Sequence, residues 1–108
     1  MLATCMVLAT MLVITGCASP AQEHVNKGNA YLKQGQYDEA AMEYSKAVEL
    51  DPQLAGGYNG LGLAYQKKGQ FEEAIADFDK AIELEPKNAE LHYNRGNVYL
   101  ERDNFKQR

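Results

Sequence analysis

The chain has 108 residues, a length that allows one small domain. Acidic residues outnumber basic ones, 15 against 11, which gives a formal net charge of −4 and a pI near 5.1. This balance excludes the basic stripe of a protein that binds a nucleic-acid backbone, and a chain without Trp and with few β-branched runs beyond its first residues is not expected to form strands.

The first segment differs from the rest of the chain. Residues 2–14 carry no charge, whereas a polar, charge-rich sequence begins beyond residue 20. A run of this length fits the apolar region of a secretion signal better than a membrane span, which needs ~20 apolar residues. It ends in the sequence ITGC at residues 14–17. This ending resembles the lipobox of bacterial lipoproteins, although the Lys or Arg that opens the leader in that family is missing here.

The resemblance implies a lipoprotein signal peptide over residues 1–16 and acyl chains on Cys17, with residues 17–22 as the lipidated cysteine and a short tether. Three acyl chains would anchor the protein permanently, because each buried methylene contributes ~0.8 kcal/mol. Ala18 is not the Asp that favours the inner membrane in this family, so the resemblance implies an outer-membrane protein facing the periplasm. With Cys17 acylated and Cys5 removed, no disulfide can form. The alternatives are an ordinary secretion signal and an apolar tail without function.

Beyond the tether, the sequence repeats itself with a period of 34 residues. Small, aromatic and proline residues recur at the same offsets without a gap: Gly28, Gly62 and Gly96; Tyr31, Tyr65 and Tyr99; Ala40 and Ala74; Tyr44 and Phe78; Ala47 and Ala81; Pro52 and Pro86. This pattern resembles the tetratricopeptide repeat. In a pair of antiparallel helices the small residues allow close approach, the aromatics fill the space between the helices, and the prolines end each second helix.

The resemblance implies an all-α fold, an antiparallel helix-hairpin solenoid with five helices after the N-terminal signal segment. We predict that the array occupies residues 23–108, with a first repeat at about 21–54, a second at 55–88 and a partial third at 89–108. In the first repeat, apolar residues at three- and four-residue spacing predict helices over about 23–34 and 37–50. Gly35 and Gly69 are expected to end the first helices in the left-handed conformation.

The third repeat stops early. Asn88 is a suitable N-cap for a helix over about 89–101, and Asp103 stands where Gly35 and Gly69 stood. Either the last helix caps the flank of the second repeat, as helical arrays require, or the chain is a fragment of a longer array. Arg108 at a packing position favours the fragment. An open end would also allow self-association.

In the family that the sequence resembles, the first helices of successive repeats line a concave groove that accepts peptides or partner helices. Spacing places these residues on that face: Gln22, Val25, Asn26, Asn29, Gly56, Asn59, Gly60, Leu63, Glu90, Tyr93, Asn94 and Asn97. Asn can donate to and accept from a peptide backbone at once. We therefore predict a peptide groove with Tyr93 as its wall, formed by Asn26, Asn29, Asn59, Gly60, Tyr93, Asn94 and Asn97. The alternative is a solvated polar face.

Two glycines in the first helix of the second repeat, Gly56 and Gly60, are expected to face this groove. Each interior Gly costs ~1 kcal/mol relative to Ala, so we expect Gly60→Ala to raise helix stability. The glycines are either tolerated drift or a bare patch that lets the backbone of a ligand come close.

No set of residues in the sequence supports catalysis, so we expect no enzyme activity, cofactor or small-molecule substrate. His24 and His92 occupy equivalent positions two repeats apart, and we expect partly buried packing residues that are too distant to share a metal. The glycines of GNAYLKQG lie within a predicted helix, so they do not form a phosphate loop.

One subclass of the resembled family, the co-chaperones, grips a C-terminal carboxylate with Lys and Asn side chains and one Arg. Only Asn29 matches that clamp, because Val25, Gly60, Glu90 and Asn94 stand at its other positions. We therefore predict a lipid-anchored scaffold that faces the periplasm and binds a protein or peptide partner in an envelope assembly, such as pilus or secretin biogenesis or a cell-wall enzyme complex. The alternatives are a cytosolic chaperone-type adaptor and a truncated targeting module of a longer enzyme.

Overall fold

A computed structural model describes residues 19–108, so the predicted signal peptide, Cys17 and the start of the tether lie outside the described residues. The described part is all-α. Its five helices are α2 (Pro20–Lys33), α3 (Tyr37–Leu50), α4 (Ala55–Lys67), α5 (Phe71–Leu84) and α6 (Ala89–Lys106). This architecture confirms the predicted all-α hairpin solenoid, and no strand occurs between residues 19 and 108.

The first helix begins earlier than the sequence pattern indicated. Ser19 is its N-cap, with a side-chain oxygen that accepts a hydrogen bond from the Gln22 amide at 3.1 Å, and Pro20 occupies the first turn. Both residues favour a helix start, because the cap satisfies a free amide and Pro has no amide to satisfy. Residues 20–22 are therefore helical, and the predicted tether is shorter by these residues.

Left-handed glycines end the first helix of each complete hairpin, as predicted. Gly35 has φ of +79° and Gly69 has φ of +78°. The third repeat has Asp103 at this position, and α6 continues through it to Lys106, past the predicted end near residue 101. A residue with a Cβ strongly disfavours the left-handed conformation, so the helix has no terminator at this point.

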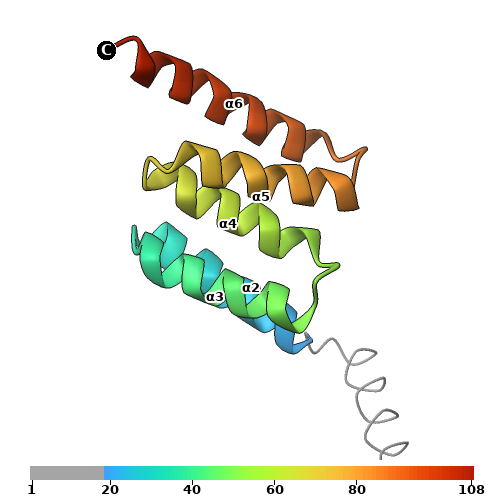
Figure 1. The fold of residues 1–108 in the computed structure, drawn as a ribbon. Helices are drawn as coiled ribbons and strands as arrows, with labels where there is room; N and C mark the ends of the chain where they lie inside the picture. The colour runs from blue at the N-terminus through green and yellow to red at the C-terminus, as the bar shows by residue number, and fades with distance from the viewer. Residues whose placement is uncertain (1–18) are drawn as a thin grey trace, which may run out of the picture.

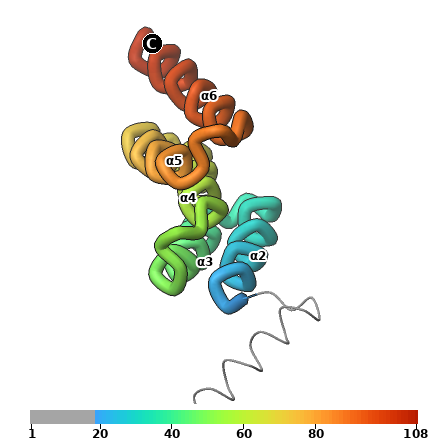
Figure 2. Tube along the Cα trace, turned by 90° about the vertical axis from the view of Figure 1, so that its right-hand side faces the viewer, coloured from blue at the N-terminus to red at the C-terminus, as the bar shows by residue number. Residues whose placement is uncertain are grey.

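The helices stack as two hairpins and a final helix. Helices α2 and α3 form the first layer, α4 and α5 the second, and α6 packs on α5 at the far end (Figure 1). The three first helices also contact one another, α2 with α4 and α4 with α6, on the side away from α3 (Figure 2). The stack thereby brings α2, α4 and α6 together along one side, which we call the inner face.

Two buried aromatics organise the core. Tyr44 of α3 and Phe78 of α5 are fully buried at equivalent positions of the two complete repeats. A Cβ added at Gly28 would lie 2.7 Å from the Tyr44 ring, and one added at Gly62 would lie 2.7 Å from the Phe78 ring. The prediction of close helix approach is therefore confirmed at these two glycines.

Gly96 does not follow that prediction. No atom lies within 4 Å of a Cβ built at Gly96. None of the described residues packs on Gly96 as Tyr44 packs on Gly28 and Phe78 on Gly62. The glycine leaves an open notch in α6.

Candidate functional site

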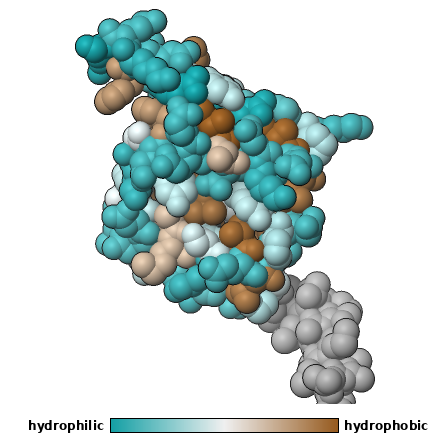
Figure 3. All heavy atoms as spheres, in the orientation of Figure 1, coloured by the Kyte–Doolittle hydropathy of each residue, from teal (hydrophilic) through white to brown (hydrophobic). Residues whose placement is uncertain are grey.

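The predicted asparagines lie along the inner face. Asn26 and Asn29 of α2 are exposed, whereas Asn59 of α4 and Asn94 and Asn97 of α6 are half-buried. Figure 3 shows the other side of the stack, that of α3 and α5, where hydrophobic residues form small separate patches between hydrophilic ones.

The Tyr44 side chain extends from α3 to the asparagines of the inner face. Its ring passes between Gly28 of α2 and Gly60 of α4, and its hydroxyl donates a hydrogen bond of 2.5 Å to the Asn29 side-chain oxygen. Burial raises the pKa of Tyr44 to about 12, so the hydroxyl stays a donor at neutral pH. Because the Asn29 oxygen accepts this bond, its amide NH₂ is left for another partner.

Gly60 is not the bare groove residue that the sequence predicted. It is buried, and a Cβ built there would lie 2.2 Å from Cε1 of Tyr44, closer than real side-chain contacts allow. The glycine makes room for the Tyr44 ring, so a ligand cannot use it as a patch. For the same reason, we now expect Gly60→Ala to lower stability instead of raising it. Gly56 does have open space around it and is exposed.

Two side-chain hydrogen bonds join α4 to α6 on the inner face. The Asn94 NH₂ donates to the Asn59 side-chain oxygen at 3.1 Å, and the Gln66 NH₂ donates to the Glu101 carboxylate. The first bond does not use the Asn59 NH₂ or the Asn94 side-chain oxygen, so each of these groups is left for another partner. The two asparagines therefore present a donor and an acceptor next to each other.

Two further predicted residues differ in their exposure. Tyr93 of α6 is 69% exposed, so its ring is available as a wall. Val25, which spacing placed on the groove side, is only 6% exposed and packs in the cluster that contains Tyr44. The apolar side chain is drawn into the core because α3 and α4 both lie behind it.

Three asparagine oxygens of the inner face accept hydrogen bonds from neighbouring side chains. The Asn26 oxygen accepts from the Gln22 NH₂ at 3.2 Å, as the Asn29 oxygen accepts from Tyr44 and the Asn59 oxygen from Asn94. In each case a neighbouring side chain occupies the oxygen and leaves NH₂ groups for other acceptors. Carbonyl oxygens of an extended peptide are acceptors of the matching kind.

The two histidines have different surroundings. His24 is half-buried and its Nδ1 lies 2.7 Å from the Glu43 carboxylate, which also binds Lys46 at 3.2 Å. The His24 hydrogen bond lowers the pKa of Glu43 below its usual value. His92 was predicted to be partly buried, but it is exposed and lies 2.8 Å from the Pro86 carbonyl. None of the helices within residues 19–108 buries it.

Two chemical features of the described helices bear on function. Residues 19–108 contain no group of three or more His, Cys, Asp and Glu side chains that could hold a metal ion. In the same residues, every helix is too short or too polar to span a bilayer.

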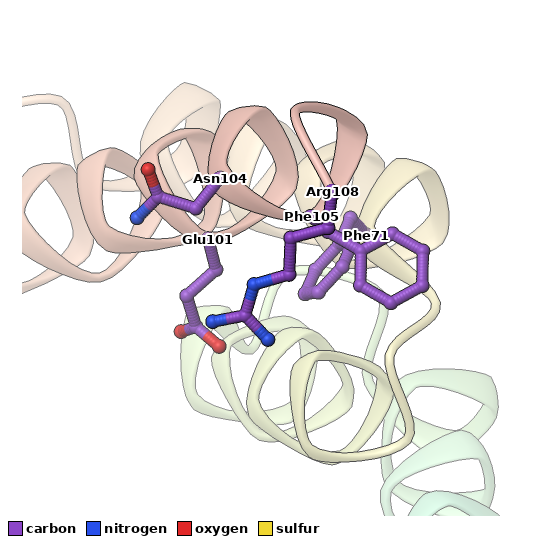
Figure 4. A pocket seen from close by; sticks show the side chains of 5 residues that line it. All are labelled: Phe71, Glu101, Asn104, Phe105 and Arg108. Carbon is purple, nitrogen blue, oxygen red and sulfur yellow. The ribbon is translucent and has the colours of Figure 1, made fainter.

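Two hollows lie away from the inner asparagines. One, of about 220 Å³, lies at the C-terminal end of α6, where the Phe71 and Phe105 rings meet edge-on with centroids 6.1 Å apart (Figure 4). Glu101 and Arg108 extend beside these rings in that view. The other hollow lies where the start of α2 meets the end of α3. Neither hollow is lined by the predicted groove residues.

Sequence reasoning missed the part that Tyr44 plays. Its position matched Phe78, which made it a packing residue, and the hydroxyl was the only sign of a second role. The additional glycine at position 60, without a counterpart one period earlier, was the signal that a bulky group fills this place from the neighbouring repeat. Gln66 and Glu101 were missed because their hydrogen bond joins unlike positions of successive repeats.

Comparisons with known proteins agree with this architecture. The family described as TPR repeat matches residues 28–69 and 67–102. A solved structure, "Second TPR of Spaghetti (RPAP3) bound to HSP90 peptide SRMEEVD", is 26% identical and superposes with a TM-score of 0.73, covering 82% of this chain and 85% of that one. No curated protein matches the sequence closely enough to count as a relative.

Proposed function

Because the chain belongs to the tetratricopeptide repeat family, we propose that it is a scaffold that binds an extended peptide segment of a partner protein across its inner face. We further propose that a lipid on Cys17 holds it in a bacterial envelope, at the periplasmic side of the outer membrane, where it recruits this partner into an envelope assembly.

One observation carries the binding proposal. Three helices each contribute an asparagine whose oxygen or NH₂ is fixed by a neighbouring side chain, namely Asn29, Asn59 and Asn94. A fixed amide loses less conformational freedom on binding than a mobile one, so the side chains are prepared for a ligand.

The anchoring proposal rests on the sequence ITGC at residues 14–17 after an uncharged run. Only Ala18 separates Cys17 from Ser19, the N-cap of α2. A lipid on Cys17 would therefore hold the first hairpin close to the membrane surface, with α6 at the distant end of the stack. The net charge of −4 adds no electrostatic attraction to anionic lipids, so the acyl chains would supply the affinity.

Labelling with radioactive palmitate tests the anchor. We expect the wild-type chain and a Cys5→Ala control to incorporate label and to sediment with membranes, and Cys17→Ala to do neither. Label on Cys17→Ala, or none on the wild type in a bacterial host, would refute the anchor. It would leave the inner-face proposal untouched, because that proposal rests on residues beyond the leader.

The solved structure with an HSP90 peptide supports a second candidate, a cytosolic chaperone-type adaptor. Three positions of the co-chaperone clamp do not fit here, because Val25 is buried, Gly60 is covered by Tyr44, and Glu90 brings negative charge to α6. Fluorescence anisotropy with labelled SRMEEVD separates the candidates. We expect no saturable binding, whereas binding that Asn29→Ala abolishes would favour the chaperone-type adaptor.

A further inference from the structure

Charge is divided unequally between the two sides of the stack. The second helices of the hairpins, α3 and α5, together carry nine acidic residues and two basic ones. The helices of the inner face, α2, α4 and α6, together carry four acidic residues and six basic ones. The negative charge of the protein is therefore concentrated on the side away from the inner face, whereas the helices of the inner face are slightly positive.

Two cations of the inner helices extend the stripe of asparagines. Lys33 lies one helical turn after Asn29 on α2, and Lys67 occupies the same position one period later on α4. Both side chains are exposed, and no ion pair of the described residues includes either of them. A lysine in the last turn also stabilises its helix, but α3 and α5 have no basic residue in the last turn. Stabilisation of helix ends therefore does not explain why these lysines occur on the inner side.

The amides beside these lysines also present donors. The Asn29 oxygen accepts a hydrogen bond from Tyr44, and the Asn59 oxygen accepts one from Asn94, so each asparagine keeps its NH₂ for another partner. Ammonium and NH₂ groups are donors only, and an ionised carboxylate is an acceptor only. The part of the inner face formed by α2 and α4 therefore matches an acidic side chain.

Helix α6 does not continue this set of cations. Glu101 stands one period after Lys67, and its carboxylate accepts a hydrogen bond from the Gln66 NH₂. Glu90 adds a second carboxylate in the first turn of α6. The match to an acidic ligand is therefore confined to the α2 and α4 part of the inner face.

We propose that the partner segment carries acidic side chains where it crosses α2 and α4, and that Lys33 and Lys67 determine this preference. The inference rests on the proposed peptide binding by the inner face. The acidic helices α3 and α5 repel the same segment, so charge directs it to the inner side of the stack. This mode uses acidic side chains within a segment and needs no free terminal carboxylate, unlike the co-chaperone clamp.

The lysines select a segment but do not bind it alone. An exposed ion pair changes affinity by less than about fivefold. Most of the affinity therefore has to come from bonds between the asparagine amides and the backbone of the segment. For this reason, the acidic residues of SRMEEVD are not expected to give saturable binding by themselves.

Selection from a phage-displayed library of random peptides, with the full chain in mild detergent as bait, tests the preference. The displayed peptides are fused at their C-termini, so they offer no free terminal carboxylate. We expect the wild type to enrich peptides with Asp and Glu, and a Lys33→Glu, Lys67→Glu variant to enrich peptides with Lys and Arg instead. The matched control, Lys27→Glu with Lys87→Glu, makes the same change in net charge at two exposed lysines outside the stripe and should select the same peptides as the wild type.

Fluorescence anisotropy with the strongest wild-type peptide, synthesised with blocked ends, measures the size of the effect. The variant with both inner lysines reversed should bind this peptide about tenfold more weakly, and the control variant less than about twofold more weakly. A rise in NaCl from about 50 to about 500 mM should weaken wild-type binding by about threefold, because salt screens exposed charges. Circular dichroism checks that each variant keeps its helices.

The outcomes separate this inference from the proposed function. Selected peptides without an excess of acidic residues, or an equal loss of affinity in the lysine variant and its control, would refute the acidic preference and leave peptide binding in place. If no peptide is enriched, or if a variant with Asn29→Ala, Asn59→Ala and Asn94→Ala binds the selected peptide as the wild type does, the inner face is not a peptide site. The inference then falls together with the proposed function.

Discussion

Replacement of Gly60 by Ala should destabilise the fold, although Ala is the better helix former. A Cβ at this position would lie 2.2, 2.4 and 2.5 Å from three atoms of the Tyr44 ring. The ring cannot move away easily, because it is fully buried and Gly28 of α2 closes its other side. A Cβ built at Gly28 would lie only 2.7 Å from the ring. Either α4 shifts or the ring leaves its place between the two helices.

The magnitude follows from opposing effects. Overpacking of a core costs about 1–3 kcal/mol, and loss of the Tyr44 hydrogen bond to Asn29 adds about 1 kcal/mol. The gain in helix propensity from Gly to Ala returns ~1 kcal/mol. We therefore expect Gly60→Ala to lower the free energy of unfolding by about 1–3 kcal/mol, which for a domain of this size lowers Tm by roughly 5–15 °C.

Gly56 provides a matched control in the same helix. It is exposed, and no atom lies within 4 Å of an added Cβ. Gly56→Ala should therefore leave stability unchanged or raise it by up to ~1 kcal/mol. Urea unfolding followed by circular dichroism at 222 nm measures both variants. If Gly60→Ala is as stable as Gly56→Ala, Tyr44 is not held between the two helices as described.

Three other substitutions test separate parts of the structure. Tyr44→Phe keeps the ring but removes the hydrogen bond to Asn29, so denaturant unfolding should show a loss of about 1 kcal/mol, and an unchanged stability would contradict the bond. Gly69→Ala forces a residue with a Cβ into φ of +78°, and a loss of about 1–2 kcal/mol is expected in thermal unfolding, whereas tolerance would show that the turn between α4 and α5 can adopt another conformation. Burial raises the pKa of Asp77 to about 6, above its usual 3.8, so the ionised carboxylate opposes folding: the stability that its protonated form contributes is complete below pH 4 and is lost as pH rises to 6. Asp77→Asn should remove this dependence and raise stability at pH 7 by on the order of 1–2 kcal/mol, and an equal pH profile for wild type and variant would show that Asp77 is solvated.

The repeat period gave most of the fold in advance. Helix α3 has the bounds that apolar spacing predicted, and Gly35 and Gly69 have the expected left-handed conformation. These features depend on local sequence, and they recur one period apart, so each complete repeat predicts them independently. The start of α2 and the end of α6 were predicted less accurately. Ser19 and Pro20 start α2 at a place without an earlier repeat for comparison, and Asp103 does not end α6.

The inner face was predicted only in part. Spacing identified the asparagines of three helices but could not show which of them bind one another, since the bond between Asn94 and Asn59 depends on how two repeats pack. Gly60 was misread for the same reason. Helix periodicity alone does not reveal that a ring from the preceding repeat fills the space beside a glycine.

The most direct test of the scaffold proposal is cross-linked affinity capture of the full chain from envelope membranes, with two sets of variants. The inner-face variant combines Asn29→Ala, Asn59→Ala and Asn94→Ala, and a control variant combines Glu39→Ala, Glu49→Ala and Glu73→Ala on the exposed surfaces of α3 and α5. We predict a protein that is captured with the wild type and the control variant and lost with the inner-face variant. Capture of the same proteins with all three chains would contradict the inner face as the binding surface.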